Sequence, residues 1–291
     1  MSEKEKWPDF DLLWDYSHPE ETESRFRQLL AKHLGDISYH AQLLTQLGRA
    51  QGLQRKFAEA HATLDEAQSL ITDDLRQARI RYLLERGRVF NSSKQPEKAR
   101  PQFLEAWETA KAAKEDFYAV DAAHMMGIIE PPEEQMEWNL RAIAVAEEST
   151  EQRARKWLGS LYNNMGWAVH GQGQYEKALE CFEKALKYRE EYGPVTEVRV
   201  ARWCIARAMR SLNRIEEAFT IQKALLDESE RLGEHDGYVY EEIAECLTVL
   251  GRSDEARPYF ELAYRQLSQD PWLVEDEPAR LERLKELGKS P

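Results

Sequence analysis

Small and large apolar residues recur along the chain at a fixed spacing. In the middle of the chain, Gly166 is followed twelve residues later by Ala178, and then by Phe182 and Ala185. An amphipathic pattern on each side of the polar segment 170–174 predicts two helices joined by a turn. Small residues at these positions let two antiparallel helices approach closely, and the aromatic ring fills the space between them.

The same set of positions returns six times. The first small position of each copy is Gly48, Gly87, Gly127, Gly166, Ala206 or Ala244. The steps between them are 39, 40, 39, 40 and 38 residues. The third and fifth copies are weaker, because Asn139 and Gln222 stand where the other copies have Ala and an aromatic residue or Leu. A fixed period of this kind indicates an array of repeated helical units.

This pattern resembles the tetratricopeptide repeat family, whose helix–turn–helix unit carries Leu-Gly in the first helix and Ala, Phe and Ala in the second. The resemblance covers roughly residues 41–264. The family repeat has 34 residues, so these copies are about five longer, like those of kinesin light chain and of bacterial peptide-sensing regulators. The resemblance implies an all-α, right-handed solenoid superhelix of about six helix pairs with capping helices.

The chain is predicted to have four parts. They are an aromatic and acidic arm (1–18), an N-terminal capping helix (19–40), six repeats in 41–264 and a C-terminal capping helix (265–291). The repeats begin near residues 41, 80, 120, 159, 199 and 237. The arm, "WPDFDLLWDY", is too apolar to stay fully solvated, so we expect it to pack on the first helices or to enter the groove of its own or a neighbouring chain.

The resemblance also implies that the first helix of each pair lines a concave groove. Helical periodicity then selects the residues that face it. They include the basic residues Arg49, Arg81, Arg88, Arg207 and Arg210 and the acidic residues Asp121, Glu241 and Glu245, a net charge of +2 in a chain of −13. Such a groove would prefer an acidic or carboxylate-bearing ligand. Alternatively, these Arg residues pair with Glu85, Asp121 and Glu242 nearby.

The residues predicted to bind a partner are Arg49, Arg88, His124, Asn163, Asn164, Trp167, His170, Trp203, Arg207 and Arg210. Trp167 and Trp203 should be neighbours on adjacent first helices, and an aromatic pair beside polar groups is typical of a binding hot spot. Alternatively, one of them is buried between helices. An Asn side chain can hold a peptide backbone with both a donor and an acceptor.

Composition and missing motifs exclude other functions. An acidic chain is unsuited to general nucleic-acid or anionic-membrane binding. No apolar run approaches the roughly 20 residues needed to span a bilayer, and no secretory signal opens the chain, so a cytoplasmic location is expected. Cys181, Cys204 and Cys246 form no CxxC pair, so neither a disulfide framework nor a zinc site is expected. No catalytic motif occurs, and neither enzymatic activity nor a cofactor is expected.

The sequence therefore predicts a non-catalytic scaffold or adaptor that binds a peptide or protein segment in its groove. A second hypothesis is a sensor that takes a short peptide or a small acidic ligand. The repeats occupy nearly all of the chain and leave little room for an effector domain, which favours the first hypothesis. Assembly with a second copy of the chain stays open.

Overall fold

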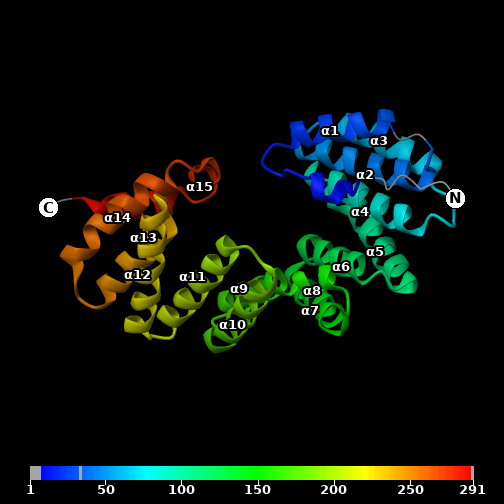
Figure 1. Ribbon diagram of the computed structural model, residues 1–291. Helices are drawn as coiled ribbons and strands as arrows, with labels where there is room; N and C mark the ends of the chain where they lie inside the picture. Colours follow the sequence, from blue (N-terminus) through cyan, green and yellow to red (C-terminus); the bar gives the residue numbers. More distant parts are fainter. Residues whose placement is uncertain (1–7, 33–34, 290–291) are drawn as a thin grey trace. The chain divides into compact units, whose positions relative to one another are not determined.

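The computed structural model describes residues 8–32 and 35–289, and Figure 1 shows helices joined by short turns throughout these ranges. No strand occurs in the described residues, so the predicted all-α solenoid of helix–turn–helix pairs is confirmed. The helices form two compact units that divide after Trp157. Each unit is described by itself.

Unit 1 contains three helix pairs, one further single helix and two short elements. Its elements are η1 (Phe10–Leu13), α1 (Pro19–Lys32), α2 (Ile37–Leu53), α3 (Phe57–Leu70), α4 (Arg76–Ser92), α5 (Pro96–Ala113), α6 (Asp116–Ile129), α7 (Pro132–Glu148) and α8 (Gln152–Lys156). Helix α2 packs on α3, α4 on α5 and α6 on α7, while α1 packs on α2. The short helix α8, which packs on α6 and α7, was not anticipated from the sequence.

Unit 2 contains three more pairs. Its helices are α9 (Leu158–Gly171), α10 (Tyr175–Tyr192), α11 (Val195–Ser211), α12 (Ile215–Leu232), α13 (Gly237–Val249), α14 (Ser253–Leu267), α15 (Pro271–Asp276) and α16 (Pro278–Gly288). Helix α9 packs on α10, α11 on α12 and α13 on α14, and α16 covers α14. Two helices, α15 and α16, thus lie where the sequence predicted a single capping helix.

Within the pairs, a small residue on the first helix meets a large one on the second. A Cβ atom at Gly166 would lie 2.4 Å from Cε1 of Phe182, and one at Gly87 would lie 2.4 Å from Cε1 of Phe103. Both rings are fully buried. Since atoms cannot approach so closely, only a residue without a side chain fits at these two positions.

In five of the six pairs, the turn between the two helices contains one residue in the left-handed conformation. These residues are Arg55, Lys94, Gly173, Asn213 and Gly251, with φ between 60° and 75°. This conformation costs a residue other than Gly about 1–2 kcal/mol, which the packing of the two helices must outweigh. The turn between α6 and α7 differs, because Pro131 with φ of −56° precedes the second helix there.

The N-terminal arm docks on unit 1 of its own chain. Phe10 is buried in a cluster with Phe26, Leu43 and Leu44, and the Tyr39 hydroxyl donates a hydrogen bond of 2.9 Å to the Pro8 carbonyl. Packing on the first helices was one of the two arrangements expected for the arm. Trp7, also assigned to the arm, lies outside the described residues.

A Gly166→Ala variant tests the small-to-large packing. We expect it to lower the free energy of unfolding by about 1–3 kcal/mol, because the new methyl group overlaps the buried Phe182 ring. Urea denaturation measures this change. Gly171→Ala on the same helix is the matched control, since nothing lies within 4 Å of its added Cβ. Equal midpoints for the two variants would contradict the packing described here.

Candidate functional site

Three aromatic side chains from successive first helices form a row in unit 2. Trp167 on α9, Trp203 on α11 and Tyr238 on α13 are called here the aromatic ladder. The ring centroids of Trp167 and Trp203 are 5.9 Å apart, and those of Trp203 and Tyr238 are 6.0 Å apart. Both Trp side chains are partly exposed, and Tyr238 is 38% exposed. The ladder therefore offers connected aromatic surface to a ligand.

Trp203 is held in place by a polar contact as well as by packing. Its indole N–H donates a hydrogen bond of 3.2 Å to the Tyr238 carbonyl at the start of α13. Trp167 packs its ring 5.1 Å from the buried Phe182. Neither Trp is fully buried between helices, and the two rings are neighbours on adjacent first helices. Their part in binding stays a prediction.

Next to the ladder, His170 contacts both an aromatic ring and a hydroxyl. Its ring centroid is 5.3 Å from that of Trp167, and its Nε2 atom is 2.9 Å from Oγ of Ser211. Burial, and then the charges of Arg207 and Arg210, lower the pKa of His170. The imidazole is therefore neutral at pH 7 and acts as a hydrogen-bonding and stacking group.

Two Arg residues beside the ladder share one buried carboxylate. Arg210 binds Glu242 through two hydrogen bonds of 2.7 and 2.9 Å, and Nε of Arg207 lies 3.2 Å from the same group. The Glu242 side chain is only 5% exposed. Burial and the neighbouring Arg210 lower the pKa of Arg207 against the opposing charge of Glu242. Arg210 also lies 4.0 Å from Glu245, so it has two carboxylates beside it, and it shares Glu242 with Arg207.

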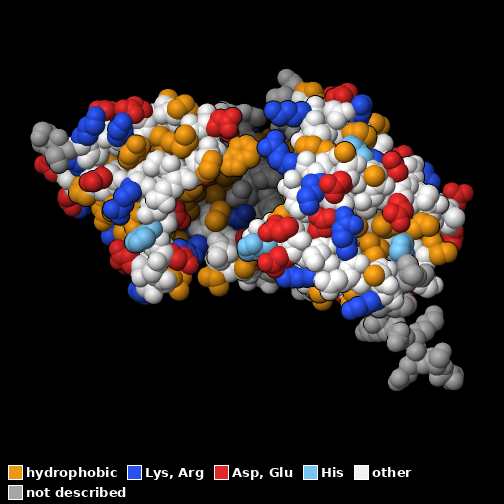
Figure 2. Space-filling model, turned by 90° about the horizontal axis from the view of Figure 1, so that it is seen from above, with side chains coloured by type: hydrophobic (Ala, Val, Ile, Leu, Met, Phe, Trp, Pro, Cys, Tyr) orange, Lys and Arg blue, Asp and Glu red, His pale blue; other side chains and the backbone are white. Residues whose placement is uncertain are grey.

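Further carboxylates of α13 pair with α16. Glu245 lies 2.5 Å from Arg283, and Glu241 lies 2.5 Å from Arg280. Of the two sequence-based readings of the groove arginines, the structure shows the paired one. Figure 2 accordingly shows acidic and basic side chains interspersed on the face that it presents.

Three of the predicted residues lie in unit 1, where each contacts other side chains of that unit. Arg88 pairs with Glu85 at 2.8 Å and with Asp121, and Arg49 lies 3.4 Å from Glu85. His124 packs its ring 5.0 Å from that of Trp157, and burial lowers its pKa. These three side chains thus belong to unit 1, and the other seven predicted residues belong to unit 2.

The two predicted asparagines have different surroundings. Asn163 is partly buried, and its side-chain oxygen accepts a hydrogen bond of 3.3 Å from the Cys204 thiol. Burial raises the pKa of Cys204 to about 11, so the thiol stays protonated. Asn164 is exposed. Asn163 is therefore partly committed to a structural contact that the sequence did not reveal.

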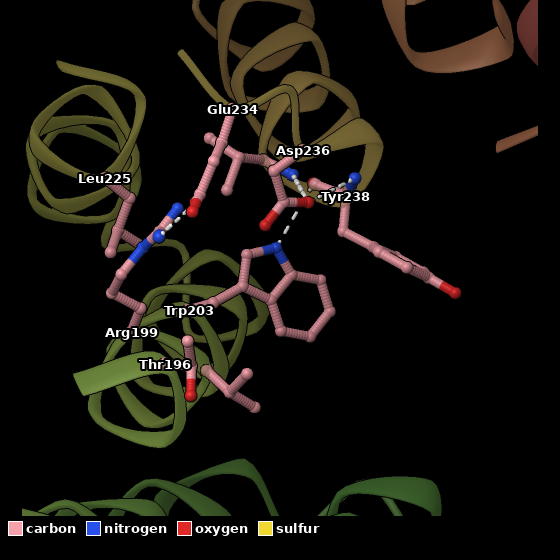
Figure 3. Close-up of a pocket in the computed structure, with 9 residues that line it drawn as sticks. Thr196, Arg199, Trp203, Leu225, Glu234, Asp236 and Tyr238 are labelled. Carbon is pink, nitrogen blue, oxygen red and sulfur yellow. Dashed lines mark hydrogen bonds and ion pairs between the residues drawn. The ribbon is translucent and has the colours of Figure 1, made fainter. Parts of the chain in front are cut away.

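A pocket of about 410 Å³ adjoins the ladder, as Figure 3 shows. Its apolar walls are Val200, Trp203, Leu225, Tyr238 and Val239. At its rim, Thr196, Arg199, Glu234 and Asp236 add polar groups, and Arg199 pairs with Glu234 at 2.6 Å. Sequence reasoning named only Trp203 as a site residue here, although Val200 and Tyr238 stand at positions that helical periodicity directs to the same face.

The contacts of Ser211 suit binding better than nucleophilic catalysis. Besides His170, its hydroxyl oxygen accepts a hydrogen bond of 2.7 Å from the Arg207 guanidinium and lies 3.2 Å from the Arg207 carbonyl. A serine nucleophile needs a base that is itself oriented by a third group. Among the described contacts of His170, none is with a carboxylate that could play this part.

Two further features are absent from the described ranges. No group of three or more His, Cys, Asp or Glu side chains there is arranged to hold a metal ion. None of the helices in this part of the chain combines the length and the apolar character that crossing a membrane requires.

Comparison with known proteins extends these observations. Residues 160–192, which lie in α9 and α10, match the tetratricopeptide repeat family. No curated protein matches the chain. Among solved structures, a signal transduction ATPase with numerous domains from Pyrococcus horikoshii, which has a tetratricopeptide repeat sensor, is similar with a TM-score of 0.69. It is 16% identical, and the match covers 93% of this chain but only 42% of that protein.

Two other solved structures are similar along nearly the whole chain. The apo form of RapI matches with a TM-score of 0.68 and 13% identity, over 92% of this chain and 80% of its own. NprR in complex with its cognate peptide NprX matches with a TM-score of 0.53 and 15% identity, over 99% and 85%. At these identities the likeness establishes the fold.

An Arg210→Ala variant tests the shared carboxylate. Removing this partner leaves the buried Glu242 with Arg207 alone, and we expect a loss of about 1–3 kcal/mol in the free energy of unfolding. Arg214→Ala breaks an exposed ion pair with Glu217 and should leave the urea midpoint nearly unchanged. If both variants behave alike, Glu242 does not depend on Arg210.

Proposed function

We propose that this chain, in which residues 160–192 match the tetratricopeptide repeat family, works by non-catalytic binding and takes a peptide or protein segment on the aromatic ladder of unit 2. The observation that carries this proposal is the ladder itself. Trp167, Trp203 and Tyr238 are in contact with one another and yet keep exposed surface. Aromatic side chains held in this way are the commonest anchors of protein interfaces.

The pocket beside Trp203 supports a specific mode of binding. Its walls are apolar, and Val200 is 49% exposed at its edge. An aromatic or branched aliphatic side chain of the ligand would bury these walls, while its flanking residues lie along Trp203 and Trp167. Pockets of this size with a few polar groups at the rim are typical ligand sites.

The positive charge of Arg207 favours a ligand that also contains an acidic residue. The Arg207 side chain is 27% exposed and shares Glu242 with Arg210, so its guanidinium group can take a further carboxylate from the ligand. A guanidinium group can bind such a carboxylate with two hydrogen bonds. The preferred segment therefore combines an apolar anchor for the pocket with a carboxylate for Arg207.

A sensor function is the second candidate. The size of the pocket favours it, because about 410 Å³ also suits a small molecule. NprR, which is similar in fold, is described in complex with a cognate peptide, and the Pyrococcus protein carries its repeats as a sensor. Thermal shift with citrate or glutamate separates the two candidates, since only a small-ligand sensor is stabilised by these compounds.

The experiment selects ligands from phage-displayed random dodecapeptides with the full chain. We expect enrichment of peptides that contain an aromatic and an acidic residue. Replacing Trp203 or Arg207 with Ala should weaken binding of a selected synthetic peptide by about 30-fold, as the loss of a hot-spot contact of about 2 kcal/mol requires. Fluorescence anisotropy measures the affinity.

Tyr259→Ala on α14 serves as the control, because this partly buried aromatic residue belongs to a second helix and not to the ladder. Circular dichroism checks that each variant keeps its helical content. Peptides that bind the Trp203→Ala and wild-type chains equally would place the ligand elsewhere and contradict the proposal.

A further inference from the structure

The arm occupies the face of unit 1 that corresponds to the ladder face of unit 2. Arg49 directly follows the small residue Gly48 on α2, as Trp167 follows Gly166 and Arg207 follows Ala206. In unit 1 this face is covered, because the Arg49 guanidinium lies 5.4 Å from the ring centroid of Trp14 and 5.3 Å from that of Tyr16. The arm thus takes the place that a ligand would take on the first helices.

Arg81 makes this face a carboxylate site. Its side chain is only 8% exposed, and both of its terminal nitrogens bind the Asp11 carboxylate, one of them at 2.9 Å. Arg153 adds a second contact to Asp11 at 3.1 Å. Burial opposes ionisation of Asp11, but hydrogen bonds and charge from these two Arg residues outweigh it and hold its pKa below the usual value. A guanidinium buried to this extent requires an anion, and among the described residues the arm supplies it.

Aromatic contacts on both sides of Asp11 complete the recognition. Phe10 is buried with its ring 5.1 Å from the Arg81 guanidinium and 5.3 Å from the ring of Tyr39. The indole N–H of Trp14 donates a hydrogen bond of 3.0 Å to the side chain of Gln46. Leu12 between them is 81% exposed. Recognition therefore depends on an aromatic residue, an Asp directly after it and a Trp three residues later.

We infer that the face of α2 and α4 is a second segment-binding site, and that the arm is its built-in occupant. The ligand that it fits is an acidic peptide with the arm's order of an aromatic residue, Asp, one variable residue, an apolar residue and Trp. A partner segment of this chemistry binds when it displaces the arm. In the part of the arm that the structure describes, regular structure is limited to the four-residue helix η1, so displacing this part unwinds no long helix.

Tethering determines how strongly the arm competes. A ligand joined to its site by a short linker acts at an effective concentration in the millimolar range. Only two residues, Ser17 and His18, separate the arm's last aromatic residue from α1. A free peptide should therefore bind the wild-type chain poorly and should bind tightly once the arm's own contacts are removed. This site is independent of the ladder of unit 2, so its test does not depend on the function proposed above.

The test uses a fluorescein-labelled peptide with the sequence of residues 8–18 and the full chain. We expect it to bind the triple variant Phe10→Ala, Asp11→Ala, Trp14→Ala at least tenfold more tightly than it binds wild type. The control Leu12→Ala changes an exposed arm residue and should bind the peptide as weakly as wild type. A peptide with Ala in place of its Asp should lose binding to the triple variant. If the triple variant does not fold, the single variant Asp11→Asn replaces it and should still bind more tightly than wild type.

Lower pH adds a second readout. The pKa of Asp11 in the docked arm is lowered, whereas a free Asp titrates near pH 3.9. Peptide affinity should therefore be constant above roughly pH 5 and fall as the free carboxylate becomes protonated. Absence of binding to folded variants would overturn the inference and leave the arm as a structural cap. A wild-type dimer that the triple variant loses would also overturn it, because the arm would then belong to the site of a second copy.

Discussion

The contact between a small residue on one helix and a large buried side chain on the next sets the geometry on which the rest of the structure depends. Where Gly166 faces Phe182 and Gly87 faces Phe103, the backbone of the first helix rests directly on a ring. This fixes the distance between the two helices and so decides where the next pair begins. The aromatic ladder is carried by helices placed in this way. Trp167 lies one residue after its small position, Trp203 three before and Tyr238 six before, which are positions that helical periodicity directs to one face.

Electrostatics then decide which parts of that face stay available. Arg88, Arg210 and Arg81 are each held by a carboxylate from a neighbouring helix or from the arm. Guanidinium groups that are shielded from water in this way are stable only beside a carboxylate, and their charge is largely neutralised inside the protein. In unit 2, the surface available to a ligand therefore consists of the aromatic ladder with Arg207 beside it. Binding there should accordingly depend more on apolar contact than on long-range attraction.

The repeat was predictable because it is a local property. Gly, Ala and Phe at constant spacing determine helix pairing through contacts between residues less than twenty positions apart. That Trp167 and Trp203 are neighbours was predictable as well, since they lie 36 residues apart on equivalent helices and helical periodicity directs both to the same face. Charge pairing with Glu85 and Glu242 was one of two alternatives that the sequence left open, because these carboxylates stand at the sides of their helices, where periodicity does not decide between a neighbour and a ligand as the partner of each Arg.

The docking of the arm also lay beyond the sequence pattern. Nothing periodic connects Asp11 with Arg81, and the Trp14 contact with Gln46 joins a segment outside the repeats to one within them. Helix α8 was missed because five residues are too few to show a period. The pocket of unit 2 depends on the loop that contains Glu234 and Asp236, whose path periodicity does not describe.

The contact between Asp11 and Arg153 gives unit 1 a property that an open array of repeats lacks. Repeats that touch only their neighbours can separate one at a time from either end. Here, residues 142 positions apart are joined across the unit, and the same carboxylate also holds α4 through Arg81. Fraying at the first helix therefore breaks contacts at the last one as well. The arm thereby raises the contact order of a fold that is otherwise built from short-range contacts, and it couples the opening of the two ends of unit 1 into one cooperative transition.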